Sequence, residues 1–182
     1  MKLALGYYEW TAIRGLYVNG SALPGAIEDL YSATVRSDAE LAVRRIEEVC
    51  PLDSELSEAS VALASCLVNA IWGRPECSLD LIVGILSDIA AGLGEDCDGD
   101  DLSEIHARCL REICRGFPMY VELLESHYVP DVRTACVDLI SACGLFDKSL
   151  TGRAIWFLEA SKKLKGMEGF HSLIDSSIDD LR

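Results

Sequence analysis

The residues with the clearest capacity for chemistry are the aspartates of a short acidic stretch, GEDCDGDD. Asp96, Asp98 and Asp100 alternate along it, as the ligands of a calcium-binding EF-hand loop do. An EF-hand also needs a glycine at its sixth position and a bidentate glutamate at its twelfth. Counted from Asp96, those positions hold Asp101 and Ala107. The stretch therefore does not predict a calcium site, and a solvated acidic loop is the simpler interpretation.

Histidine and cysteine, the other common ligands and nucleophiles, do not gather at useful spacings. The three histidines, His106, His127 and His171, belong to different predicted elements, and none of the eight cysteines forms a CxxC pair. We find no nucleophile motif, no phosphate-binding glycine loop and no HExxH. The sequence thus predicts a protein that is not an enzyme and has no metal or cofactor. Most cysteines fall on apolar helical stripes, which is typical of small buried side chains in a reducing compartment.

The net charge of −14 sets the class of partner that the chain could bind. Nucleic acid and anionic membranes require clustered lysine and arginine, so both are disfavoured as partners. No apolar run approaches the ~20 residues of a membrane span, and the opening stretch is too short for a secretory signal, so we expect a cytoplasmic protein. A basic protein partner fits this charge. The competing interpretation is that the acidity only maintains solubility.

The elements that would position any such surface are helices. Residues 117–144 show the clearest pattern, with apolar or small side chains at spacings of three and four along each of two segments. Pro118 and Pro130 suit the first turns of the two predicted helices, and Gly144 is predicted to end the second. The segment is therefore interpreted as an antiparallel helical hairpin. Such a hairpin cannot bury both faces alone, and it needs further hairpins stacked against it.

The remainder of the chain supplies them, and it shows no strand-like alternation. The other predicted helices are 24–31, 37–50, 55–72, 78–91, 102–115, one through 155–165 and one over 170–181. The end of the fourth predicted helix, DIAAGLG, weakly repeats DLISACG before Gly144. We therefore predict one all-α domain of residues 1–182, in which 1–52 and 145–182 provide capping helices and 53–144 provide stacked hairpins.

The turn that begins the second helix of the 117–144 hairpin resembles a HEAT repeat. Pro130 and Asp131 lead into Val132 and Arg133, and in HEAT repeats the valine packs inward while the aspartate and arginine connect successive turns. The resemblance implies a short right-handed α-solenoid of HEAT-like hairpins. An ordinary α-hairpin within a helical bundle is the competing interpretation.

A wider resemblance runs from Trp10 to Gly144. Trp10, Tyr17 and Pro24, then Glu58-Ala59-Ser60 before an apolar helix, and then LDLIVGILSDIAAG follow the order of elements in a group of bacterial HEAT-repeat proteins. The turn before Ser78 and the C-terminal residues depart from that pattern. Members of the group often resemble immunity proteins encoded beside secreted toxins. The resemblance thus implies a protein-binding role without naming a partner. The function that we favour is binding and neutralising a basic toxin or effector domain by occlusion and charge complementarity.

Two other functions stay open on the sequence. One is a general HEAT-repeat scaffold or adaptor, and the other, more distant, is a helical-repeat DNA glycosylase, which would need a basic groove that the scattered arginines do not predict. The predicted partner-binding residues combine an aromatic side chain at a helix end with acids on the second helices of the hairpins and in the acidic loop. They are Trp72, Asp80, Asp88, Asp96, Asp98, Asp100, Asp101, Asp131 and Asp138.

Overall fold

The computed structural model describes residues 1–52, 55–73, 75–92 and 104–182. Within these ranges the regular secondary structure is helical and there is no strand. The one extended pairing among the described residues is an isolated bridge between Arg14 and Asn19. The prediction of an all-α protein is confirmed. In this part of the chain no helix is both long and apolar enough to cross a bilayer.

The N-terminal region is a helical pair preceded by an irregular segment. A single turn, α1 (Lys2–Leu5), is followed by a stretch that the Trp10 indole fixes in place by donating a hydrogen bond of 2.7 Å to the Leu5 carbonyl. The 3₁₀ turn η1 (Gly20–Ala22) then leads into α2 (Leu23–Ser32). The next helix, α3 (Arg36–Glu47), packs along α2. The two helices agree with those predicted from the apolar spacing.

The helix α4 (Glu58–Ile71) lies at the centre of the molecule and is buried on nearly every side. It contacts α2, α5 (Leu79–Ala91) and α6 (Glu104–Cys114), which explains why apolar residues cover its whole circumference. At the end of α5, Gly92 has a φ of 59°, in the left-handed region that glycine adopts without steric cost. The prediction that this helix ends at Ala91 is confirmed.

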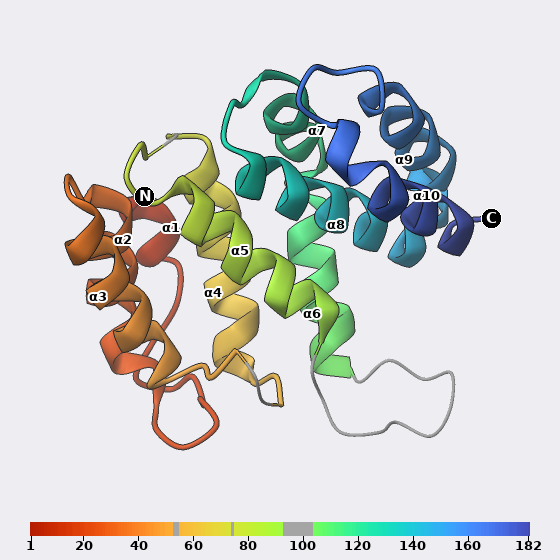
Figure 1. Cartoon of the computed structure of the whole chain (residues 1–182). Coiled ribbons are helices and arrows are strands. Elements are labelled where there is room, and N and C mark those ends of the chain that lie inside the picture. Colours follow the sequence, from red (N-terminus) through yellow and green to blue (C-terminus); the bar gives the residue numbers. More distant parts are fainter. Residues whose placement is uncertain (53–54, 74, 93–103) are drawn as a thin grey trace.

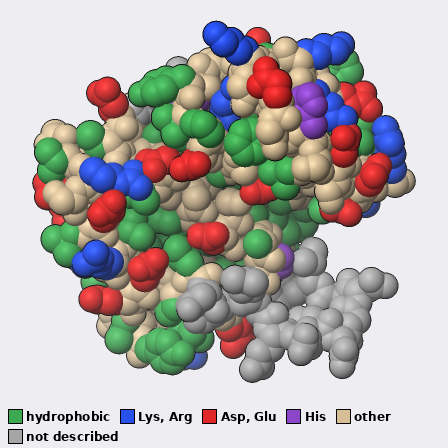
Figure 2. All heavy atoms as spheres, viewed as in Figure 1, with side chains coloured by type: hydrophobic (Ala, Val, Ile, Leu, Met, Phe, Trp, Pro, Cys, Tyr) green, Lys and Arg blue, Asp and Glu red, His purple; other side chains and the backbone are tan. Residues whose placement is uncertain are grey.

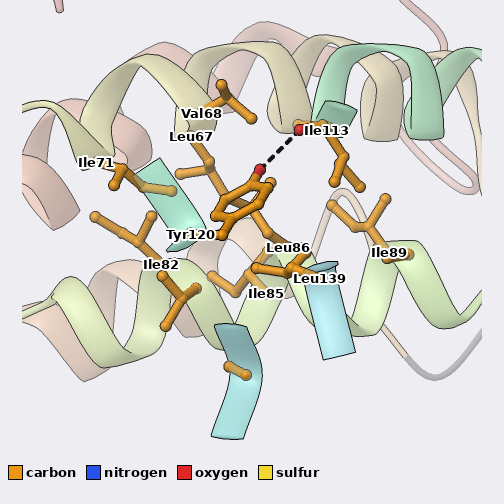
Figure 3. Close-up of a cluster of buried hydrophobic side chains, with 14 of the residues drawn as sticks. Leu67, Val68, Ile71, Ile82, Ile85, Leu86, Ile89, Ile113, Tyr120 and Leu139 are labelled. Carbon is orange, nitrogen blue, oxygen red and sulfur yellow. Dashed lines mark hydrogen bonds between the residues drawn. The ribbon is translucent and has the colours of Figure 1, made fainter. Parts of the chain in front are cut away.

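A break at Gly116 separates α6 from α7 (Phe117–Ser126). The buried Tyr120 lies against this break and donates a hydrogen bond of 2.9 Å to the Ile113 carbonyl, as Figure 3 shows among the surrounding aliphatic side chains. A Cβ at position 116 would lie 2.4 Å from the Tyr120 hydroxyl oxygen, so the close approach requires glycine. Because of the break, α6 packs on α4 whereas α7 packs on α8 and α9.

The C-terminal helices are α8 (Pro130–Phe146), α9 (Lys148–Ser161) and, after the turn η2 (Glu168–Phe170), α10 (His171–Asp180). The predicted hairpin of α7 and α8 is present, but the prediction that Gly144 ends its second helix is wrong, because α8 continues through it. A Cβ at Gly144 would lie 2.8 Å from both the Ala154 Cβ and a Leu181 methyl carbon. The glycine therefore serves close helix packing.

Helices that follow one another in the chain pack in pairs, α2 with α3, α4 with α5, α7 with α8 and α9 with α10, while α6 packs on α4, α5 and α8 (Figure 1). On one side, α3 contacts α5, α5 contacts α8 and α8 contacts α10. On the other, α2 contacts α4, α4 contacts α6 and α7 contacts α9. One continuous apolar core runs from Leu5 to Leu181 between these two rows. The helices α3, α5, α8 and α10 are the second helices of their pairs, and we call them the inner row.

Candidate protein-binding surface

Two of the predicted binding residues lie on α5 and α8, two helices that contact each other. Asp138 lies on α8 and is half-buried, and its carboxylate accepts a hydrogen bond of 3.5 Å from the Ser87 hydroxyl on α5. Asp88, the next residue on α5, is exposed. Neither carboxylate has a basic partner among the described residues. We call Asp88 and Asp138 the central acids.

Partial burial disfavours the ionised form of both central acids. Partial burial raises the pKa of Asp138 above its usual value, and the hydrogen bond from Ser87 opposes that rise only in part. Partial burial of its carboxyl also raises the pKa of Asp88, although the residue as a whole is exposed. The folded protein thus keeps two acids in places where ionisation is disfavoured. Groups of this kind gather at functional sites.

The remaining described acids of the prediction lie at the starts of the same two helices. Asp80 is in the first turn of α5, where its two oxygens accept hydrogen bonds of 2.7 and 2.6 Å from Nη1 of Arg36 at the start of α3. Asp131, in the first turn of α8, is exposed. Both carboxylates suit the positive end of a helix dipole. Asp80 is therefore already compensated within the fold, whereas the central acids are not.

A hollow of about 560 Å³ opens beside these helix starts. Three elements that are distant in sequence form it: the start of α3, the turn into α5 and the turn between α7 and α8. Its lining residues are Arg36, Glu76, Cys77, Leu79, Asp80, His127, Tyr128, Val129 and Val132. The His127 and Tyr128 rings stack at its edge, with centroids 5.1 Å apart and planes 12° apart.

Trp72 does not line this hollow or lie at the contact between α5 and α8. It caps the C-terminus of α4 and is 62% exposed. The neighbouring Gly73 is closed in by Tyr31 of α2, because a Cβ there would lie 2.3 Å from the Tyr31 hydroxyl oxygen. Trp156 on α9 is equally exposed, so exposure alone does not distinguish Trp72. The predicted residues Asp96, Asp98, Asp100 and Asp101 lie outside the described residues.

The face that carries the inner row is predominantly acidic. In Figure 2 it faces the viewer, with acidic side chains spread over it and basic ones mainly toward its rim. Apolar side chains separate the charges, so the acids are distributed and do not form one dense patch. A surface of this kind attracts a cationic partner over a broad area rather than holding one ion.

The described residues offer no arrangement for metal chemistry. No group of three or more His, Cys, Asp or Glu side chains among them could hold a metal ion. His106 reaches the end of α5, with Nε2 3.0 Å from the Ala90 carbonyl, and His171 reaches the Lys162 carbonyl at the same distance. Five cysteines are buried and free, as the apolar pattern predicted: Cys50, Cys66, Cys109, Cys136 and Cys143. Burial raises the pKa of the Cys136 thiol to about 12, so it stays protonated.

Sequence reasoning missed the hollow and most of its residues. Glu76 and Tyr128 lie in turns, and Arg36 begins a helix far from both in sequence, so no local spacing connects them. One available signal was the tyrosine in the turn HYVPD, since a large aromatic residue in a short polar turn is either buried or available for contact. Comparison with protein-family models, with curated proteins and with solved structures found no match for this chain.

Proposed function

We propose that this protein binds a basic protein partner through the inner row, with the central acids near the middle of the contact. The observation that carries the proposal is Asp138, whose carboxylate is held half-buried without a basic partner among the described residues. A cation supplied by another protein would provide the compensation that the chain lacks. Such a contact adds both attraction at a distance and specificity at the site.

We further propose that the helix pairs form a short right-handed α-solenoid of HEAT-like hairpins. The contacts between like members of successive pairs support it. So does Arg133, the arginine of the HEAT-like turn, which is buried and donates to the Leu124 carbonyl of α7 at 2.9 Å and to the Lys165 carbonyl beyond α9 at 2.8 Å. One side chain thereby joins two successive pairs, as the resemblance leads one to expect. Solenoids of this kind bind partners along one row of helices.

The partner class that we favour is a bacterial toxin or effector domain, which the protein would neutralise in the cytoplasm as an immunity protein. The sequence resemblance supports this class, and the net charge of −14 supports a basic partner. Toxins that act on nucleic acids need a basic surface, and an acidic protein can cover it by presenting carboxylates where phosphates would bind. Neutralisation in this form requires occlusion only, and no residue of this chain would be catalytic.

The test is capture from the native host with three baits. They are the wild-type protein, the double variant Asp88→Asn with Asp138→Asn, and a control, Glu28→Gln with Glu168→Gln, which removes the same charge from exposed positions on α2 and η2. We expect one basic protein to be retained by the wild type and the control, released by raised salt, and lost from the central double variant. Equal retention by all three baits would show that the central acids do not contribute to binding. Capture of several housekeeping proteins would favour the scaffold function.

A further inference from the structure

The hollow beside the starts of α5 and α8 combines a flat aromatic edge with a negative charge. Tyr128 is 83% exposed, and its ring stacks on His127. The His127 ring is held by the backbone, because its Nδ1 accepts a hydrogen bond of 3.2 Å from the Val129 N–H. The turn thus presents a supported aromatic pair that the core does not use.

The charge of the hollow favours a cation. Arg36 and Asp80 neutralise each other through the bidentate hydrogen bonds described above. Glu76 also lines the hollow, is exposed, and leaves one negative charge in excess. The floor is apolar, since Leu79 and Val132 are buried and present only hydrocarbon. A ligand with a hydrocarbon stem and a cationic head matches this order of surfaces.

We propose that the hollow binds an arginine side chain of the protein partner. Its methylenes would lie on Leu79 and Val132, its planar guanidinium would stack on Tyr128, and Glu76 would accept its hydrogen bonds. Arginine is favoured over lysine because a planar guanidinium matches both an aromatic face and a carboxylate fork. The proposal deepens the proposed function and rests on it for the partner, while the chemistry of the hollow can be tested alone.

The test uses the whole protein and three short acetylated, amidated peptides, each with one central residue between glycines: arginine, citrulline or lysine. Citrulline is the uncharged isostere of arginine. Backbone amide shifts in NMR would report binding. We expect the arginine peptide to shift the amides of residues 76–80 and 127–132, and the citrulline peptide to bind at least about threefold more weakly. Equal binding of citrulline or lysine, or shifts spread over the surface, would overturn the assignment.

Two variants and a control complete the test. Tyr128→Ala and Glu76→Gln should each weaken the arginine peptide by about two- to fivefold. Tyr17→Ala removes a tyrosine of similar exposure, 77%, from another part of the surface and should change nothing. An unchanged affinity in Tyr128→Ala would overturn the stacking role. The peptide experiment needs no natural partner. If the wild-type protein does not bind the arginine peptide but still captures a basic protein from the host, this proposal is rejected and the proposed function stands.

Discussion

Two of the helices that contact α8, namely α9 and α5, are packed against it in different ways. Toward the C-terminus, Gly144 lets α8 approach closely, with Ala154 of α9 and Leu181 beyond α10 filling the space where a side chain would stand. Toward α5, the contact includes a polar pair, Ser87 and Asp138, whose hydrogen bond is long at 3.5 Å. The C-terminal side of α8 is therefore packed to exclude even a methyl group. The side that faces α5 accepts a half-buried carboxylate.

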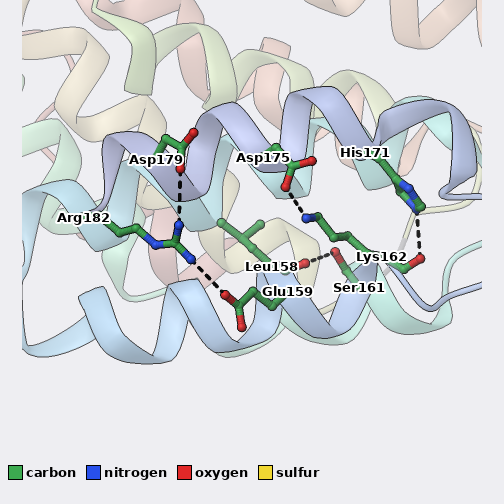
Figure 4. A network of polar contacts seen from close by, with 8 residues as sticks. All are labelled: Leu158, Glu159, Ser161, Lys162, His171, Asp175, Asp179 and Arg182. Carbon is green, nitrogen blue, oxygen red and sulfur yellow. Dashed lines mark hydrogen bonds and ion pairs between the residues drawn. The ribbon is translucent and has the colours of Figure 1, made fainter.

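The acids on these two sides of α8 also differ in whether they have cationic partners. Three acids on α9 and α10 have cationic partners, as Figure 4 shows: Lys162 pairs with Asp175, and Arg182 reaches Glu159 at 3.3 Å and Asp179 at 3.4 Å. The central acids on α5 and α8 have no basic partner among the described residues. An acid paired within its own fold serves the fold, whereas one held ionised against partial burial is available to a partner. This contrast, more than the total charge, supports the proposal that the central acids take part in binding.

The largest expected effect concerns Arg133. Replacing it with methionine keeps most of the hydrocarbon stem and removes the donors to the Leu124 and Lys165 carbonyls. We expect a loss of about 2–3 kcal/mol in the free energy of unfolding, since one buried and one partly buried carbonyl lose a charged donor. Urea denaturation measures it. Arg182→Met is the control, because its ion pairs are exposed and should contribute less than about 0.5 kcal/mol. A similar small loss for both variants would remove Arg133 as the link between helix pairs.

Two glycines in helix interiors test how closely the helices pack around α8 and α5. Gly144→Ala forces a methyl group into contact with Ala154 and should destabilise the protein by about 1–3 kcal/mol. Gly84 lies in α5, and nothing lies within 4 Å of the position that a Cβ would take there. Gly84→Ala should therefore stabilise the protein by about 0.5–1 kcal/mol through helix propensity. Thermal unfolding of both variants measures the difference. Shifts of the same sign would contradict the distinction between the two neighbours of α8.

These two glycines also indicate how much of the fold the sequence could predict. Apolar spacing and proline positions predict helices such as 78–91 and the two of the 117–144 hairpin, because those signals are local. The role of a glycine is not local. Gly92 ends a helix through its own backbone conformation, whereas Gly144 matters because of residues that reach it from α9 and the C-terminus. No nearby residue distinguishes the two cases.

The candidate site, too, could be predicted only where its signals are local in the sequence. The acids of α5 and α8 could be placed on the second helices from their spacing, but whether each is compensated depends on distant residues. Asp80 turned out to pair with Arg36, and Asp138 to face Ser87. The hollow was not predicted at all, because Arg36, Glu76 and Tyr128 meet only when three turns converge.

A smaller effect is expected from the pH dependence of Asp138. Its carboxyl has a raised pKa in the folded protein, so ionisation favours the unfolded chain. This loss of stability is present above the folded pKa. It disappears as the pH falls through the folded pKa toward the ordinary value of 3.8. Asp138→Asn should therefore be more stable than the wild type at pH 7, by about 0.5 kcal/mol or less after solvent screening, and the advantage should shrink toward pH 4.

Denaturation at both pH values measures that advantage, with Asp175→Asn as the control. Asp175 has a cationic partner in Lys162, so its replacement should not stabilise the protein at pH 7. If Asp138→Asn is less stable than the wild type at pH 7, the carboxylate contributes to the fold. It would then resemble the acids of α10, and the contrast between the two neighbours of α8 would no longer hold.

The smallest expected effect is the coupling between Lys162 and Asp175. The Lys162 side chain is 29% exposed and that of Asp175 is 58% exposed, so solvent and salt screen the pair. A double-mutant cycle with Lys162→Met and Asp175→Asn should give a coupling of about 0.2–1 kcal/mol that falls as salt is added. The same variants should capture the basic partner as the wild type does, because this pair lies on α9 and α10 and its charges are already satisfied. A marked loss of capture would move the binding surface toward the C-terminus, since the partner would then be competing for acids that the fold already pairs.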